Sequence, residues 1–314
     1  MSEEKVALGR RLFFEPRLSI TGGYSCASCH DPARSFSDGR RVAIGATGET
    51  LPHSAMALVN VAYNVSFGWT KPELRTLEAQ MLEPLLNEHP VELGLAGRQE
   101  SMVKVMRSDP GYAQAFVLAF GHAPVTFDHI VKAIAAFERT LISGNSAFDR
   151  YVFNGEHGAL SPAAKRGMSL FFSARAGCSA CHSGFNFAGN WRDSQGETGA
   201  TSFASNGVSP QPMRVPTLRN IALTAPYMHD GRFATLDSVL DHYARVAQSA
   251  RRESPPNTDR RLRTFDLNST ERADLVAFLR SLTDLSIAHP GDSRTVGDRN
   301  VLRLSGHPGE PGAQ

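Results

Sequence analysis

All four cysteines of this 314-residue chain fall in two pentapeptides of the same pattern. The first is CASCH, from Cys26 to His30, and the second is CSACH, from Cys178 to His182. A C-x-x-C-H motif is typical of covalent haem c attachment, in which two thiols bond the porphyrin vinyl groups and the histidine binds the iron. A redox or zinc-binding CxxC beside a chance histidine is the alternative for one motif alone. Two motifs without a spare cysteine favour two attached haems.

We therefore predict a thioether and iron-ligand set that is repeated once along the chain. The predicted haem-binding residues are Cys26, Cys29 and His30 for the first haem, and Cys178, Cys181 and His182 for the second.

The composition limits the other classes of partner. The chain is 41% hydrophobic and 20% charged with a net charge of +2, as expected for a globular protein with no nucleic-acid partner. No apolar run approaches the roughly 20 residues of a membrane span. The N-terminal sequence MSEEKVALGRRLFF lacks the layout of a signal peptide. Because haem c is attached outside the bacterial inner membrane, we expect a periplasmic protein whose signal is absent from this chain.

The two motifs belong to a longer internal repeat. GRRLFF (9–14) precedes the first motif and GMSLFF (167–172) precedes the second, while AFERTL (136–141) and AFLRSL (277–282) follow them at a distance. Such self-similarity indicates duplicated structural units.

We expect three regions from this repeat. The predicted regions are an N-terminal cytochrome c-like domain over residues 1–155, a C-terminal cytochrome c-like domain over 156–290, and a disordered Gly- and Pro-rich tail over 291–314.

The closing segment of each repeat has a helical pattern. Apolar residues recur there at spacings of three and four, as on one face of an amphipathic helix. They are Ile130, Ile134, Phe137 and Leu141 in the first unit, and Leu275, Phe278, Leu279 and Leu282 in the second. Asn268 can cap the second helix, and Ser161–Pro162 can begin another. Strand-like alternation is scarce, so we predict a mainly α fold.

Several ordered stretches resemble one known family. LGRRLFFEPRLS, CASCHDPARSFSDG and VPTLRNIALTAPYMHDGRFATL, with the two closing helices, resemble the bacterial dihaem cytochrome c peroxidase and MauG family. The resemblance runs from Gly9 to Leu282. It implies two mainly α cytochrome c-like domains, one haem c in each and a calcium ion between them. It favours the MauG-like branch, which includes a member of copper-peptide (methanobactin) operons.

The sixth ligand of the second iron depends on one helix. Leu236, Leu240 and Tyr243 fall on one face of the stretch from 234 to 247, which by itself predicts only a buried tyrosine. Counted from the PY-x-H-x-G motif (226–231), Tyr243 takes the position that is methionine in the peroxidases and tyrosine in MauG. The resemblance therefore implies that Tyr243 ligates the iron opposite His182. Met228 and His242 remain alternative ligands.

The first iron has no matching side chain. The family's distal histidine maps to Ala46 or Thr47, so the resemblance implies a five-coordinate iron that is open to hydrogen peroxide. His53 remains an alternative ligand.

The resemblance also supplies the residues around the peroxide site. It maps a catalytic carboxylate onto Glu92, a distal proline onto Pro84 and a pocket glutamine onto Gln80, with two extra residues between Pro84 and Glu92. A carboxylate there can move a proton during O–O cleavage. Trp69 matches the tryptophan that lies between the haems and relays oxidising equivalents. Trp191 is a possible exit point.

Two further features follow from the family. A calcium site is implied at Asn60, Thr224 and Pro226, the last two through backbone carbonyls. MauG has a surface tryptophan two residues before its second motif, and Ala176 stands there instead. This departure argues against MauG's own reaction on a methylamine dehydrogenase precursor.

These observations predict an oxidoreductase of the haem peroxidase class. The predicted enzyme uses hydrogen peroxide to form a high-valent two-haem state that oxidises tryptophan or tyrosine of a partner protein by long-range electron transfer. The alternative is a peroxidase that reduces peroxide to water with electrons from a small donor protein. A non-catalytic dihaem electron carrier is a third possibility, which the missing distal histidine disfavours.

Overall fold

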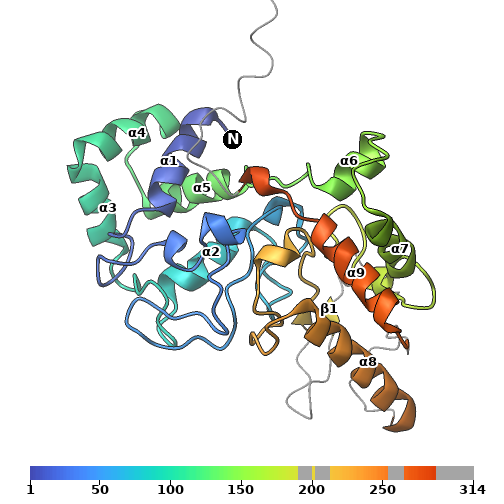
Figure 1. Cartoon of the computed structure of the whole chain (residues 1–314). Helices are drawn as coiled ribbons and strands as arrows, with labels where there is room; N and C mark the ends of the chain where they lie inside the picture. The colour runs from blue at the N-terminus through green and yellow to red at the C-terminus, as the bar shows by residue number, and fades with distance from the viewer. Residues whose placement is uncertain (190–199, 202–212, 254–264, 288–314) are drawn as a thin grey trace, which may run out of the picture.

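The computed structural model describes residues 1–189, 200–201, 213–253 and 265–287 (Figure 1). The α-helices are α1 (Glu3–Phe13), α2 (Leu77–Leu86), α3 (Gln99–Ser108), α4 (Pro110–Phe120), α5 (Phe127–Glu138), α6 (Ala147–Phe153), α7 (Pro162–Phe171), α8 (Leu236–Glu253) and α9 (Ser269–Ser281). The only strands in the described ranges are β1 (Ala200–Thr201) and β2 (Met213–Arg214), which pair antiparallel. The mainly α prediction is confirmed. Trp191 and the tail from 291 lie outside the described residues.

Side-chain caps fix several helix starts where the sequence predicted them. Asn268 accepts a hydrogen bond from the Glu271 amide at 2.9 Å and begins α9. Ser161 accepts from the Ala164 amide at 3.1 Å, and Pro162 is the first residue of α7. These caps satisfy amides that have no partner inside the helix.

The core of the first domain forms where α1 crosses α5. Gly9 lies at the crossing, and a Cβ placed on it would lie 1.8 Å from the carbonyl oxygen of Ala133. Glycine therefore permits the closest approach of the two backbones. Phe13 from α1 and Phe137 from α5 pack there with ring centroids 5.2 Å apart, and the buried Phe36 completes an aromatic cluster.

The second domain repeats this crossing with α7 and α9. A Cβ on Gly167 would lie 1.9 Å from the carbonyl oxygen of Asp274. Phe171 and Phe278 pack with ring centroids 5.0 Å apart, and Phe187 takes the place that Phe36 has in the first domain. The internal repeat is therefore a repeat of packing as well as of sequence.

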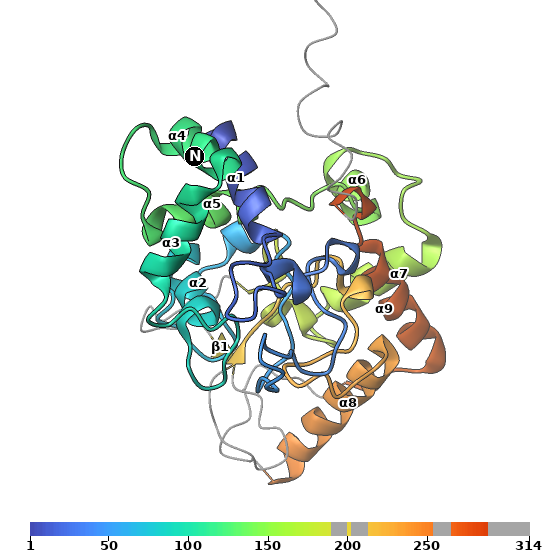
Figure 2. The same cartoon turned by 90° about the vertical axis from the view of Figure 1, so that its left-hand side faces the viewer.

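The two domains stand side by side, with α1 to α5 in one and α6 to α9 in the other (Figures 1 and 2). Helix α6 precedes residue 155, yet its Phe148 packs against Phe187 and Phe278 of the second core. Long segments without α-helix connect α1 to α2 and α2 to α3, and they carry Cys26, Trp69 and Glu92.

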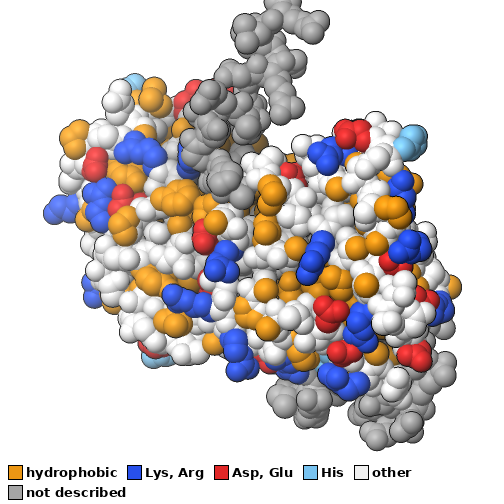
Figure 3. Space-filling model, in the orientation of Figure 1, with side chains coloured by type: hydrophobic (Ala, Val, Ile, Leu, Met, Phe, Trp, Pro, Cys, Tyr) orange, Lys and Arg blue, Asp and Glu red, His pale blue; other side chains and the backbone are white. Residues whose placement is uncertain are grey.

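No helix in the described part of the chain is long and apolar enough to cross a membrane. On the face seen in Figure 3, acidic and basic side chains alternate without a large area of one sign.

Candidate dihaem site

The first CxxCH motif lies on a short 3-10 helix, Cys26–Ser28. The turn folds tightly because the His30 amide donates to the carbonyl of Cys26 at 2.9 Å. The Nδ1 atom of His30 lies 2.8 Å from the carbonyl oxygen of Phe36. A backbone carbonyl at Nδ1 fixes the ring so that Nε2 is the nitrogen left for a metal. Burial lowers the pKa of His30, which favours the neutral imidazole that ligates iron.

The second motif has the same geometry. It lies on the 3-10 helix Cys178–Ala180, and the His182 amide donates to the Cys178 carbonyl at 2.9 Å. His182 Nδ1 lies 3.0 Å from the carbonyl oxygen of Phe187, and burial lowers the pKa of this histidine too.

Both orienting carbonyls belong to buried phenylalanines with left-handed backbone. The φ angles are 60° at Phe36 and 48° at Phe187. A bulky residue rarely adopts this conformation, which costs on the order of 1–3 kcal/mol. The buried ring keeps each residue in place, since Phe36 is 0% exposed and Phe187 is 2% exposed. The packing of the core thus aims a carbonyl at the histidine of each CxxCH motif.

A cavity of about 320 Å³ opens beside the first motif. Its walls bring together residues that the sequence predicted for the first haem and the peroxide site. These are Cys26, Cys29, His30, Trp69, Gln80, Pro84 and Glu92. Ala43 and Gly45 line it, whereas Thr47 is exposed on the loop where the family's distal histidine would stand.

The segment after α2 folds back and carries Glu92 to this cavity. Pro84 is in the last turn of α2, and its carbonyl accepts a hydrogen bond from the Leu93 amide at 2.9 Å. Burial raises the pKa of Glu92, and nearby Glu83 adds to the rise. Glu92 therefore has the raised proton affinity that suits a proton-transfer group.

Trp69 lies at the contact between the domains. Its Nε1 donates a hydrogen bond to the Ser54 carbonyl at 3.0 Å, and the Ser54 amide donates to the His229 carbonyl at 2.8 Å. The rings of His53 and His229 each have their centroid 6.4 Å from that of Trp69. Trp69 lines both the large cavity and a smaller one of about 70 Å³ that residues of both domains enclose.

Arg214 is a site residue that the sequence patterns did not reveal. It lines both cavities, and its amide donates to the Trp69 carbonyl at 2.9 Å. Its guanidinium contacts the Ser66 carbonyl and the Met56 sulfur, while Nε is buried without a hydrogen-bond partner. No carboxylate of the described residues pairs with it, so burial lowers its pKa. A buried, unpaired cation between two cavities fits the propionate carboxylates of haem.

Tyr243 lies on α8, close to the second motif. Burial raises its pKa, and the sulfur atoms of Cys181 and Cys178 contribute to that rise. The phenol is therefore neutral in the protein alone and needs a cation beside it to become a phenolate. Such a site fits an iron held by His182.

The two alternative ligands lie in different surroundings. His242 packs on Phe233 with ring centroids 5.0 Å apart, and its charged neighbours are Arg232, Arg245 and Asp230. Met228 lines the small cavity at the junction, where its carbonyl accepts from the Ser54 hydroxyl at 3.1 Å.

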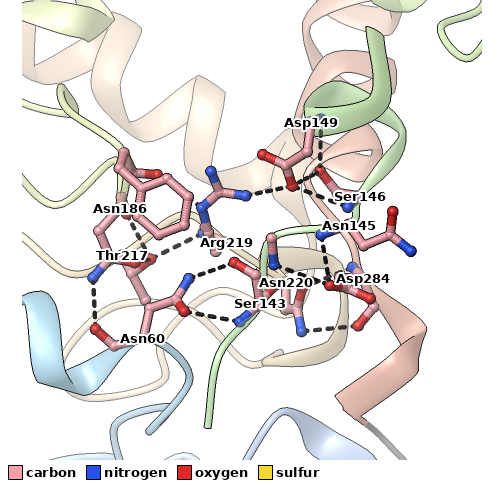
Figure 4. A network of polar contacts seen from close by, with 12 residues as sticks. Asn60, Ser143, Asn145, Ser146, Asp149, Asn186, Thr217, Arg219, Asn220 and Asp284 are labelled. Carbon is pink, nitrogen blue, oxygen red and sulfur yellow. Dashed lines mark hydrogen bonds and ion pairs between the residues drawn. The ribbon is translucent and has the colours of Figure 1, made fainter. Parts of the chain in front are cut away.

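A pair of equivalent asparagine hydrogen-bond patterns, one in each domain, lies where the domains meet (Figure 4). The Asn60 side chain pairs with the backbone amide and carbonyl of Ser143, both at 2.8 Å. Asn220 does the same with Asp284, at 2.8 Å to the amide and 3.2 Å to the carbonyl. Each asparagine thus clasps the chain just beyond the closing helix of its own domain. The clasps meet where the Ser143 hydroxyl lies 3.2 Å from the Asn220 side-chain oxygen.

The residues of the predicted calcium site fall in two places. Thr224 and Pro226 line the small cavity. Asn60 is fully buried in its clasp with Ser143 and is not among the residues that line that cavity. The described residues contain no cluster of three or more His, Cys, Asp or Glu side chains that could hold a metal ion.

Comparison with known proteins identifies this architecture. MauG of Methylorubrum extorquens is 37% identical over 290 residues, which cover 90% of this chain and 79% of that protein. The chain belongs to the dihaem cytochrome c peroxidase and MauG family. A family model described as di-haem cytochrome c peroxidase matches residues 3–157, and one described as cytochrome c matches residues 164–283.

MauG-type proteins and cytochrome c peroxidases resemble this chain to a similar degree. A cytochrome c551 peroxidase of Nitrosomonas europaea is 34% identical and covers 88% of this chain and 79% of its own length. The crystal structure of a MauG-like protein associated with microbial copper homeostasis superposes with a TM-score of 0.80 at 35% identity. That match covers 93% of this chain and 92% of the other. The protein is thus an oxidoreductase of the dihaem peroxidase type with two haems c.

Proposed function

We propose that this dihaem enzyme uses hydrogen peroxide to oxidise a tryptophan or tyrosine of a partner protein at long range. The observation that carries the proposal is the position of Tyr243 beside Cys178 and Cys181. When bound, the haems supply peroxide reduction and storage of two oxidising equivalents. A hard, anionic phenolate at the second iron favours storage, whereas a methionine raises the reduction potential and favours electron delivery.

The first haem, held by Cys26, Cys29 and His30, is the peroxide site in this proposal. Glu92 takes a proton from peroxide and returns it to the leaving oxygen, with Gln80 and Pro84 shaping the pocket. The raised pKa of Glu92 suits this exchange, because a group that must both accept and donate a proton works best when its pKa lies near the ambient pH. The His53 ring packs with Trp69 and His229. This packing supports a role for His53 in the contact between the domains rather than as a ligand of the first iron.

Trp69 relays the oxidation between the domains. Its indole touches both cavities, and its Nε1 proton is held by the Ser54 carbonyl. The hydrogen bond between the Ser143 hydroxyl and the Asn220 side-chain oxygen links the two clasps and supports a fixed spacing of the domains. A fixed spacing matters because electron transfer weakens steeply with distance.

The partner differs from that of MauG. Ala176 stands where MauG has its surface tryptophan, and here this position is 5% exposed. The oxidation therefore leaves by another route. The MauG-like neighbour associated with copper homeostasis suggests a partner from such a system. On the face seen in Figure 3, the mixed acidic and basic side chains support docking by shape rather than by one dominant charge. We further propose a periplasmic location and a calcium ion held by Asn60, Thr224 and Pro226, which requires the Asn60 side chain to turn from Ser143 toward the small cavity.

Peroxide titration of the diferric holoprotein tests this proposal. We expect high-spin and low-spin haem before addition, and a shared change in both haem spectra after one equivalent of peroxide. Tyr243→Phe should keep both haems attached and abolish the shared change. Tyr243→Met should shift the enzyme toward peroxide reduction with a small cytochrome or cupredoxin as donor.

His242→Phe is the matched control, because it changes the neighbouring aromatic residue on α8. The proposal is wrong if Tyr243→Phe leaves both spectra and the peroxide response unchanged. A wild-type enzyme that turns over peroxide only with a donor protein, and never modifies a tryptophan or tyrosine, would establish the ordinary peroxidase instead.

A further inference from the structure

Glu138 is a buried acid on the wall of the first haem cavity. It is the last residue of α5, is 7% exposed and lines the cavity that holds the first motif. In the repeat, the residue after the closing phenylalanine is Glu138 in AFERTL and Leu279 in AFLRSL. Leu279 is also 7% exposed, so the two domains bury a carboxyl and an aliphatic side chain at equivalent places.

Glu138 differs from the other buried acids in having no partner. Asp149 pairs with Arg219 at 2.7 Å, and Asp274 pairs with Arg166 at 2.6 Å. The Oε2 atom of Glu138 is buried without a hydrogen-bond partner among the described residues. An unpaired carboxyl in such a place is costly and is best kept protonated.

Its surroundings oppose ionisation near neutral pH. Burial raises the pKa of Glu138 to about 8, with a further contribution from Glu78, while Arg139 lowers it. The Arg139 charge is largely engaged, since it forms an ion pair with Glu78 at 2.8 Å. Glu138 also stands at the C-terminal end of α5, where the helix dipole disfavours a negative charge. Around the same cavity stand Tyr24, His53, Lys71, Glu83, Glu92 and Arg214.

We propose that Glu138 is the proton site linked to the redox state of the first haem. At pH values where Glu138 is ionised in the oxidised protein, reduction of this haem would raise the proton affinity of the Glu138 carboxylate, which then takes up a proton from solvent. Loss of the electron releases the same proton. The coupling arises because a change of one unit charge inside the same cavity, where water screens it poorly, changes the proton affinity of a buried carboxyl. The second domain lacks this site, since Leu279 cannot bind a proton.

Redox titration of the holoprotein at a series of pH values tests the assignment. In the wild type, the midpoint potential of the first haem should fall as pH rises through about 8, while the second haem shows no such step. Glu138→Gln should remove the step. A redox difference infrared spectrum should show a carboxylic acid C=O band that Glu138→Gln lacks. Glu138→Leu copies the second domain and provides another variant without the proton site.

Glu92→Gln is the matched control, because it removes the other carboxyl of the same cavity. Glu78→Gln removes a nearby, more exposed carboxyl. Both control variants should keep the step near pH 8. The assignment fails if Glu138→Gln and Glu138→Leu retain the step, or if Glu92→Gln abolishes it. These measurements do not depend on the partner or on Tyr243, so they stand apart from the test of the proposed function.

Discussion

Replacing Gly9 by alanine should push α1 and α5 apart. The added Cβ would lie 1.8 Å from the Ala133 carbonyl oxygen, and ordinary C···O contacts are about 3.3 Å or longer. Both colliding groups belong to helix backbones, so no side chain can rotate to relieve the overlap. The helices must separate by roughly 1.5 Å, which loosens the contact of Phe13 with Phe137.

Two effects determine how far Gly9→Ala lowers the free energy of unfolding. Alanine is about 1 kcal/mol more favourable than glycine inside a helix. Overpacking a closed interface costs about 1–3 kcal/mol and occasionally more, and a backbone collision belongs at the upper end. We expect Gly9→Ala to lower the free energy of unfolding by about 2 kcal/mol. Gly167→Ala should act alike at the crossing of α7 and α9, where the added Cβ would lie 1.9 Å from the Asp274 carbonyl oxygen.

Urea unfolding of the holoprotein, followed by circular dichroism, measures the change. Gly23→Ala and Gly158→Ala are the controls, one in each repeat unit, because a Cβ there meets nothing within 4 Å. The double variant Gly9→Ala with Gly167→Ala should be additive within about 0.5 kcal/mol, since the sites lie in separate cores. If Gly9→Ala unfolds at the same urea concentration as Gly23→Ala, the close crossing does not require glycine.

Three further substitutions, and one control substitution, test the site and the ion pairs of the fold around it. Glu92→Gln should lower peroxide turnover by about 10²–10⁴-fold at unchanged haem content. Because burial raises the Glu92 pKa above its usual 4.5, wild-type activity should fall with decreasing pH below that raised pKa, and the variant's pH–rate profile should lack this limb. Trp69→Phe should slow the response of the second haem in single-turnover mixing but spare the first. Arg219→Met should cost about 3–5 kcal/mol in urea unfolding, because it removes one partner of a buried ion pair and leaves Asp149 without its cation. Lys132→Met, which breaks an exposed pair with Asp128, should cost under about 1 kcal/mol.

The sequence was informative where function rests on local pattern. The CxxCH turns and the capped starts of α7 and α9 depend on neighbours in the chain. The resemblance added Trp69, Gln80, Pro84 and Glu92, and the structure places all four on one cavity with the first motif. The roles of these residues remain predictions.

Other features depend on contacts between distant segments, which a single sequence does not encode visibly. In the sequence, Arg214 does not differ from the other arginines. Only the fold shows that it lines both cavities and that no carboxylate of the described residues pairs with it. Asn60 was predicted only as a calcium ligand, and its clasp with Ser143 spans 83 positions. One signal was available in advance, because the repeat sets Glu138 against Leu279 at equivalent positions. An acid at a position where its duplicate is apolar indicates a site of special chemistry.

The hydrogen bond from Trp69 to Ser54 decides what kind of charge the indole can carry. A peptide carbonyl is a very weak base, so it holds the Nε1 proton without accepting it. If Trp69 relays oxidation, removal of an electron leaves a cation that keeps its proton, rather than a neutral radical. When the electron returns to Trp69, the indole does not have to take up a proton. Transfer between the domains should therefore show little solvent deuterium isotope effect, in contrast to the proton-dependent steps at Glu92.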